Sequence, residues 1–192
     1  ELYPQSRSYL DVYERFGLLR PRAVYAHCIH LDATDRARMK ALGAAAAVCP
    51  TSNLFLGSGL FDFAAADEAG FDYGFASDVG GGSSFSPFRT MLAAFEVARM
   101  RGKTLPPAEL WYRHTLGAAR AMGLSQQVGN IAVGMEADFI ALDPGATPLL
   151  QRRSSLARSL DEWLFSLIVL GDDRVIHQTY AAGAAVRPGQ MA

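Results

Sequence analysis

The sequence has no excess of charge and few cysteines, and each scarcity excludes a class of protein. Its 18 basic and 19 acidic residues leave a net charge of −1, without the clustered Lys and Arg that nucleic acid or an anionic membrane requires. We therefore expect no nucleic-acid partner and no membrane partner. The 2 cysteines, Cys28 and Cys49, are too few for a disulfide framework and suit a reducing cytoplasm. Because both lie in apolar surroundings, they are interpreted as small buried hydrophobic residues.

The sequence also lacks a long apolar run and an N-terminal leader. No uninterrupted stretch is long enough to indicate a transmembrane span, and no charged segment followed by an apolar one indicates a signal peptide. The chain opens on Glu1 rather than on an initiator Met. This start suggests a piece of a longer protein.

Several catalytic signatures are missing as well. A catalytic zinc ion takes about three protein ligands, but the sequence contains no H-x-H, no H-E-x-x-H and no C-x-x-C. Cys49 precedes Pro50 and no C-x-x-C follows, which excludes the deaminase fold that carries H-x-E and P-C-x-x-C. The glycines of VGGGSS (79–84) have neither the spacing nor the Lys of a phosphate-binding loop.

The sequence does contain apolar segments of strand length that alternate with helical segments. Half of its 192 residues are hydrophobic, enough for a sizeable core. Strands are predicted over 23–31, 44–50 and 71–78, and a loop is predicted over 51–59. Helices are predicted over 6–17, 35–42, 60–69, 86–100, 106–113 and 115–124. The first helix is expected to carry Tyr9, Val12, Tyr13 and Phe16 on one face. Asp32 or Thr34 is expected to cap the second helix, and Thr115 the last.

The order of these elements predicts an α/β fold, because near-continuous apolar strands separated by helices indicate parallel strands covered on both faces. A closed (β/α)8 barrel needs eight strands and about 250 residues. Residues 1–127 are therefore expected to supply the last three strands and helices of a TIM-like barrel, with the edge of an open sheet as the alternative.

The remaining residues, 128–192, are expected to form a segment of a small β-domain. The predicted parts are two strands within 129–143, a polar connection over 146–159, a helix at about 156–170 that packs on the barrel, and a hairpin over 175–186 that turns near Gly183.

Two residues with catalytic chemistry stand late in predicted strands. Asp78 ends the third strand, directly before the glycine-rich loop. In a parallel barrel that is the carboxyl-terminal rim where active sites are built, and a carboxylate there can bind a cation and accept a proton from water. His27 approaches the same rim, where an imidazole can bind metal or hydrogen-bond a substrate. Each also has a plainer interpretation, Asp78 as a turn residue and His27 as a core histidine.

Other polar residues carry weaker signals. Asn53 follows the second predicted strand and would lie at the same rim, either as a substrate contact or as a structural turn residue. His30, three positions after His27, should face the other side of the strand. His114 and His177 join no carboxylate cluster in the sequence and are interpreted as surface or packing residues.

Longer segments carry a family resemblance. HCIHLDATDRARMKALGAAAAVCPTSNLFLGSG and ASDVGGGSSFSPFRTMLAAFEVAR resemble the aminohydrolase branch of the amidohydrolase superfamily. TLGAARAMGL with GNIAVGMEADFIALD is similar to the passage from barrel to β-domain in that superfamily, and LGDDRVIHQTYAAG is similar to its guanine-deaminase members. The resemblance covers nearly the whole chain in the same order. It implies the C-terminal part of a metal-dependent (β/α)8 barrel with part of a small composite β-sandwich built from both chain ends.

The resemblance also implies a chemistry. Asp78 matches the aspartate that holds the metal in that family, and His27 matches the sixth-strand histidine that contacts the substrate or the attacking water. We expect one zinc ion per subunit, with iron as the alternative, and hydrolytic deamination of guanine, a small-molecule purine, by a homodimer. The family's H-x-H, its fifth-strand His, its proton-shuttling Glu and its purine-reading residues would precede Glu1. Two alternatives stay open: deamination of another purine, pyrimidine or triazine, and a catalytically silent barrel fragment.

Overall fold

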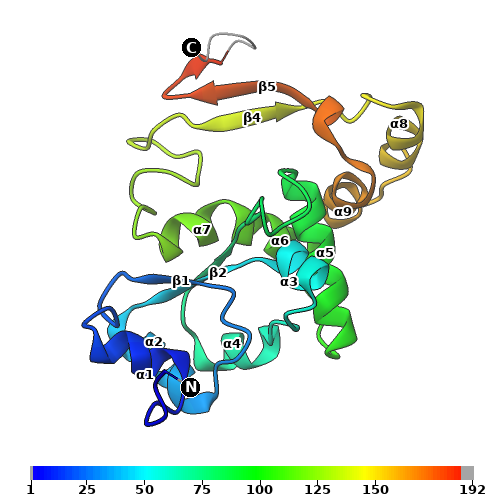
Figure 1. Cartoon of the computed structure of the whole chain (residues 1–192). Coiled ribbons are helices and arrows are strands. Elements are labelled where there is room, and N and C mark those ends of the chain that lie inside the picture. The colour runs from blue at the N-terminus through cyan, green and yellow to red at the C-terminus, as the bar shows by residue number, and fades with distance from the viewer. Residues whose placement is uncertain (1, 187–192) are drawn as a thin grey trace.

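A computed structural model describes residues 2–186, and its first half is a parallel sheet covered by helices (Figure 1). The strands are β1 (Val24–Ala26), β2 (Ala45–Val48) and β3 (Tyr73–Phe75), in the order β1-β2-β3. Both pairings are parallel, with Tyr25 opposite Ala46 and Ala46 opposite Tyr73. The three predicted strands and their parallel arrangement are confirmed, although each strand is shorter than the apolar segment that predicted it.

Helices alternate with these strands and cover them. They are α1 (Tyr9–Arg15), α2 (Ala33–Leu42), α3 (Pro50–Leu56), α4 (Phe63–Ala69), α5 (Pro87–Met100), α6 (Pro107–His114) and α7 (Leu116–Ala121). Local chemistry sets their ends. At the start of α2 the Asp32 side chain accepts a hydrogen bond from the N–H of Asp35, and Gly43, with a φ of +64°, ends the helix. Of the two predicted caps for α2, Asp32 is therefore the one that the structure uses.

The predicted loop over 51–59 is wrong, because most of it belongs to α3. Pro50 occupies the first turn, where its missing N–H costs no hydrogen bond, and Gly57 ends the helix with a φ of +68°. The side chains that α3 buries are polar, among them Ser52 and Asn53. A helix that buries polar residues has no apolar periodicity, so the sequence pattern could not show it.

The predicted face of α1 is partly wrong. Tyr9 and Phe16 are exposed, with 68% and 57% of their surfaces accessible, whereas Leu10 is buried. Tyr13 does pack inward, stacked on Tyr25 of β1 with ring centroids 5.3 Å apart. The inward face of α1 is therefore the one that carries Leu10 and Tyr13, and Tyr13 packs it against β1.

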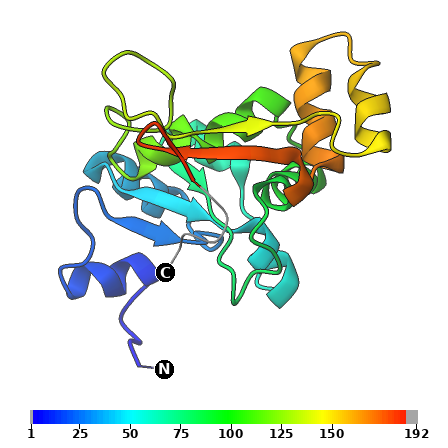
Figure 2. The same cartoon turned by 90° about the horizontal axis from the view of Figure 1, so that it is seen from above.

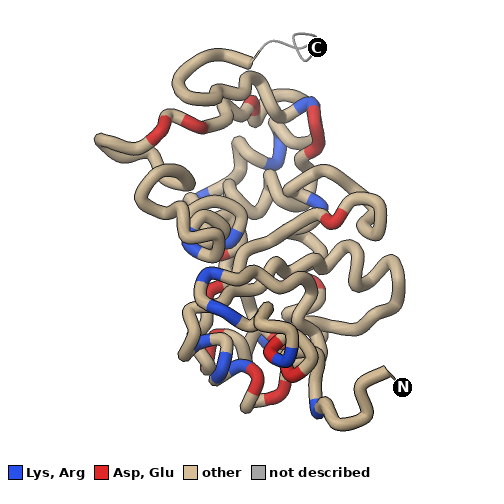
Figure 3. The backbone as a smooth tube through the Cα atoms, turned by 60° about the vertical axis from the view of Figure 1, so that its left-hand side comes forward, with Lys and Arg blue, Asp and Glu red and all other residues tan. Residues whose placement is uncertain are grey.

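Ion pairs fasten α1 to α2. The Arg38 guanidinium bonds Asp11 at 2.6 Å, and the Arg7 guanidinium bonds the buried Asp35 at 2.6 Å. Figure 3 shows charges of both signs intermingled along the backbone and side by side around these N-terminal helices. The pairing of opposite charges agrees with the balanced composition of the sequence.

The second half carries a separate antiparallel sheet. Its strands are β4 (Phe139–Leu142), β5 (Ile176–Ala181) and β6 (Ala184–Ala185), in the order β4-β5-β6. The predicted hairpin is confirmed, with its turn at Ala182 and Gly183. Only one of the two strands predicted within 129–143 forms in the described residues, because most of 128–137 is turn and coil. Residue 1 and residues 187–192, which the domain prediction includes, lie outside the described residues.

Two further helices lie between β4 and β5 along the chain. They are α8 (Pro148–Ser154) and α9 (Leu160–Leu170), followed by the short 3-10 helix η1 (Asp173–Val175). The predicted helix at about 156–170 is confirmed as α9, which packs on α5 and α6 and places Phe165 against Phe95 with ring centroids 4.9 Å apart. The predicted polar connection is instead largely α8, capped by Thr147, and it lies beside α9 at one end of the β4–β5 pair (Figure 2).

Helices α6 and α7 lie between the two sheets in Figure 1. Thr115 joins them, but its side chain does not cap α7; its hydroxyl donates back to the Trp111 carbonyl at 2.9 Å. Within the described residues, we find no helix with the length and apolar character that a membrane crossing needs.

A close approach of backbones holds α7 against the parallel sheet. A Cβ added to Gly74 of β3 would stand 2.6 Å from the Cα of Ala118 in α7. Only glycine permits this approach, since the obstacle is backbone that cannot turn away.

We expect Gly74→Ala to destabilise the protein by about 1–3 kcal/mol, the usual cost of overpacking a core. Urea denaturation measures the change. Gly145→Ala is the matched control, because its added methyl group would meet only the side chain of Asp143 in an exposed loop. Equal stabilities of Gly74→Ala and the parent would show that β3 and α7 can separate without cost.

His114, at the end of α6, is partly buried. Its Nε2 is buried without a hydrogen-bond partner among the described residues, and its ring lies edge-on to Phe75 at 5.8 Å between centroids. Burial lowers the pKa of His114 to about 4. The packing role predicted for His114 is thus confirmed, and His177 is exposed on β5.

This histidine should make the fold sensitive to acid. Its folded pKa of about 4 lies below the ordinary value of 6.5, so the neutral form stabilises the fold above pH 6.5. That contribution is lost as pH falls toward 4, at up to about 1.4 kcal/mol per pH unit. We expect His114→Leu to flatten the fall of the urea midpoint between pH 6.5 and 4, and His177→Leu, at an exposed site, to leave it unchanged. Parallel pH curves for His114→Leu and the parent would contradict the assignment.

Candidate functional site

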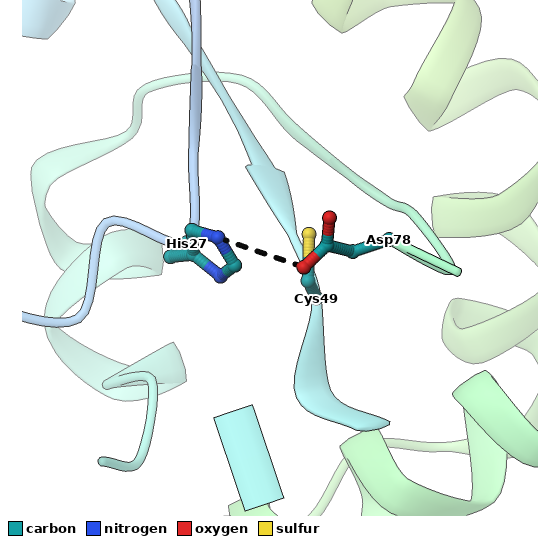
Figure 4. A group of neighbouring side chains, drawn as sticks. All are labelled: His27, Cys49 and Asp78. Carbon is teal, nitrogen blue, oxygen red and sulfur yellow. Dashed lines mark ion pairs between the residues drawn. The ribbon is translucent and has the colours of Figure 1, made fainter. Parts of the chain in front are cut away.

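Three chemically active side chains meet at one edge of the parallel sheet. His27 follows directly after β1, Cys49 follows directly after β2, and Asp78 comes three residues after β3. Parallel strands direct their carboxyl ends to the same edge, so residues far apart in the sequence become neighbours there. Figure 4 shows the three side chains converging. The predicted approach of His27 and Asp78 to one rim is confirmed.

The distances describe an open cluster. His27 Nε2 lies 3.8 Å from Asp78 Oδ2, and these two side chains are each a little over one-third exposed. Cys49 is the buried member of the cluster and is only 2% exposed. One ligand atom of each of the three residues lies within 4.8 Å of those of the other two. Solvent can therefore reach the histidine and the carboxylate but not the thiol.

The backbone is strained at and near the residues that carry these side chains. His27, Cys28 and Asp78 have φ values of +64°, +55° and +48°, in the left-handed region that residues other than glycine rarely adopt. Each such residue costs on the order of 1–3 kcal/mol, and such strain clusters at functional sites. The N–H of His27 donates a hydrogen bond to the Ala47 carbonyl at 2.8 Å, which stabilises the strained backbone at this residue.

The glycine-rich loop closes tightly over Asp78. A Cβ added to Gly81 would stand 2.9 Å from Asp78 Oδ2 and 3.2 Å from Ser52 Oγ. The N–H of Gly82 donates to the Asp78 carbonyl. The glycines of 79–84 thus serve a close turn around a carboxylate rather than a phosphate.

Asn53 lies behind His27 rather than at an open rim. It belongs to the first turn of α3 and is 2% exposed. Its Oδ1 lies 2.8 Å from His27 Nδ1. Its Nδ2 is buried and finds no hydrogen-bond partner among the described residues. The structure therefore brings Asn53 to the histidine, on the ring side opposite to Asp78.

A cavity of about 450 Å³ opens on the other side of His27, toward α1. Its lining includes Tyr9, Tyr25, His27 and His30, but neither Asp78 nor Asn53. The prediction that His30 faces the other side of the strand from His27 does not apply, because β1 ends at Ala26 and the alternation of a strand does not extend to His30.

Two further residues of this region, Cys49 and Ser52, carry no functional prediction from the sequence. Cys49 was interpreted only as a buried hydrophobic residue, although the argument that places His27 after β1 also places Cys49 after β2. Ser52 is fully buried near Asp78, and its hydroxyl has no hydrogen-bond partner among the described residues. No sequence signal distinguishes it from a loop serine.

Burial determines the chemistry of the thiols. It raises the pKa of Cys28 to about 12, and it also raises the pKa of Cys49, to which the nearby Asp78 charge adds. Cys28 thus stays a protonated thiol; of the two cysteines predicted to be buried, Cys49 is buried and Cys28 is only partly so. Cys49 stays protonated at neutral pH unless a cation occupies the cluster, because a coordinating thiol loses its proton.

The cluster fits a zinc ion by the types of its donors. Imidazole nitrogen, cysteine sulfur and carboxylate oxygen are the three ligand types that zinc takes in proteins. The exposed side of His27 and Asp78 leaves room for further ligands or for water. The donor set is compatible with a metal, and the open side is compatible with catalysis.

Comparison with known proteins agrees with this geometry. The family model described as "Amidohydrolase family" matches residues 2–186. The guanine deaminase of Escherichia coli (strain K12) is 42% identical over 185 residues, which cover 96% of this chain and 42% of that protein.

Solved structures are similar over the same range. The structure titled "E. coli Guanine Deaminase" superimposes with a TM-score of 0.93 at 41% identity, over 97% of this chain and 44% of that one. The guanine deaminase of C. acetobutylicum "with bound guanine in the active site" gives a TM-score of 0.83 at 27% identity, over 97% and 44%. The chain thus spans less than half the length of the relatives that it matches. From the parallel sheet, the converging site and a family match that runs through nearly all described residues, we conclude that the chain belongs to the amidohydrolase family.

Proposed function

We propose that this chain is part of a metal-dependent hydrolase that converts guanine and water into xanthine and ammonia. The observation that carries the proposal is the approach of His27 Nε2 and Asp78 Oδ2, 3.8 Å apart at the carboxyl-terminal edge of the parallel strands. Support comes from the relatives, which are named guanine deaminases, one of them with guanine bound in its active site.

Asp78 would be this chain's principal metal ligand. Its carboxylate lies against the tight glycine loop and is partly open to solvent, which suits a ligand that also reaches a reactant. Zinc is proposed, with iron as the alternative. When bound, such a cation supplies a water molecule that ionises near neutral pH.

Each of this chain's residues would then have a distinct task. Asp78 would accept the proton of the attacking water while the water oxygen bonds to the amino-bearing ring carbon. His27 would contact the substrate or that water and stabilise the polar centre that forms there. Asp78 would return that proton to the amino group as the carbon–nitrogen bond breaks, so that the amine leaves as ammonia and the hydroxyl-bearing ring tautomerises to xanthine. Asn53, expected from the sequence to contact substrate, would act there by way of His27, since its own side chain is buried.

The wider architecture of the protein is part of the same proposal. Residues 1–127 would supply the last strands of a (β/α)8 barrel, and 128–192 would supply part of a composite β-sandwich domain. The three parallel strands and the separate antiparallel sheet support this division. A cytoplasmic homodimer acting on a small-molecule purine is proposed for the full-length protein.

We expect Asp78→Asn to lose both metal and turnover. The amide keeps the shape of the side chain but removes the negative charge that binds the cation and accepts the proton. Metal analysis of the purified full-length protein and the rate of guanine loss measure the two effects. Asp72→Asn, at the opposite end of β3, removes an acid that lies 3.6 Å from Arg120 and serves as the control. Full metal content together with full activity in Asp78→Asn would exclude Asp78 from the site.

We expect His27→Ala to keep the metal, because Asp78 rather than His27 is proposed as this chain's principal ligand, but to slow the reaction. An acid–base or polarising side chain typically contributes ~10²–10⁴-fold to a rate. The same two measurements apply, with the exposed His177→Ala as control. Loss of metal in His27→Ala, with metal and activity both kept in Asp78→Asn, would reverse the two roles. Turnover of another aminated ring in place of guanine would retain the chemistry and refute the substrate.

A further inference from the structure

We propose that Asn53 is a positioning residue that fixes the tautomer of His27. Its Oδ1 would hold a proton on Nδ1 of the imidazole, so that Nε2 is the nitrogen presented toward Asp78. The kinetic consequences of this inference rest on the proposed function, whereas the tautomer itself does not.

The two nitrogens of His27 face different partners. Nδ1 lies 2.8 Å from Asn53 Oδ1, and Nε2 lies 3.8 Å from Asp78 Oδ2. A carboxamide oxygen has no proton to donate, so the short contact is a hydrogen bond only if Nδ1 carries the proton. The hydrogen bond made by one ring nitrogen determines the state of the other. Nδ1 is therefore protonated whether the ring is neutral or charged.

This tautomer leaves an unusual pair of groups at the open side. In the neutral ring, the Nε2 lone pair faces the Asp78 carboxylate oxygen, and both are acceptors. Two acceptors 3.8 Å apart are satisfied by a cation or by a proton donor such as water between them. The hydrogen bond from Nδ1 to Asn53 thus leaves Nε2 and the Asp78 carboxylate available for the chemistry proposed above.

Asn53 is held firmly enough to act in this way. Its N–H donates to the Cys49 carbonyl at 2.9 Å, and its own carbonyl accepts from the N–H of Ser58 at 2.9 Å. The side chain is 2% exposed, so the amide cannot turn away to water. Removal of a group that orients a histidine through its other ring nitrogen typically lowers affinity or activity by about 10–100-fold.

A direct contact with substrate fits the geometry less well. Asn53 does not line the cavity beside His27, and its buried Nδ2 has no partner among the described residues. The flipped amide would donate from Nδ2 to Nδ1 and would move the proton of the ring to Nε2. The two orientations thus predict opposite tautomers, which makes the proposal measurable.

The test is ¹⁵N NMR of the imidazole nitrogens in the full-length protein at neutral pH, with the His27 signals identified by their loss in His27→Ala. We expect a protonated Nδ1 in the parent and in Asn53→Asp, because a carboxylate also accepts from Nδ1–H. Asn53→Leu should lose this preference. Leu54→Ala, at the next and exposed position of α3, should retain it. A neutral His27 with its proton on Nε2 in the parent would overturn the proposal, even if Asn53→Leu did not fold.

Steady-state kinetics supplies the second measurement. A positioning role predicts that Asn53→Leu lowers kcat by about 10–100-fold with little change in KM, and that Asn53→Asp recovers most of the loss. A raised KM with unchanged kcat would instead identify a substrate contact and overturn the proposal. If the parent protein does not convert guanine but shows the expected tautomer changes, the proposed function fails and the positioning role stands.

Discussion

Parallel pairing of β1, β2 and β3 is the constraint on which the candidate site depends. Each strand is short, yet the shared direction places the residues that follow them at one edge of the sheet. His27, Cys49 and Asp78 come together because of this pairing and not because of any local motif. A change that alters the register of one strand would therefore separate these three side chains, which no single segment contains.

Support for the site comes from two different sources. In front, strained backbone at His27 and Asp78 turns the side chains toward each other. On the side of α3, polar side chains of its first turn are buried next to these residues. Burying a polar group costs free energy unless the group forms a hydrogen bond. The parallel sheet, packed against α7 through Gly74, provides the rigidity that holds this unfavourable geometry in place.

Local chemistry in the sequence predicted much of the fold. The strands, the cap at Asp32, α9 and the final hairpin follow from apolar periodicity and from residues with strong preferences at helix ends and turns. The failures have a common cause. In α3 and α1 the buried face is chosen by what lies opposite, so Asn53 is buried and Phe16 is exposed against the pattern of the chain. Likewise, β1 ends at Ala26, so the alternation of a strand could not predict the side of His30.

The sequence by itself determined that Asp78 and His27 are the residues to examine, because each follows an apolar strand in a chain that alternates strands and helices. It also determined the family, whose motifs run along nearly the whole chain. Only the tertiary structure decided that Cys49 lies beneath these two residues and that the Asn53 amide lies against the imidazole. Side-chain direction at the end of a strand depends on φ values and on packing across elements, and neither is encoded in the spacing of residues along the chain.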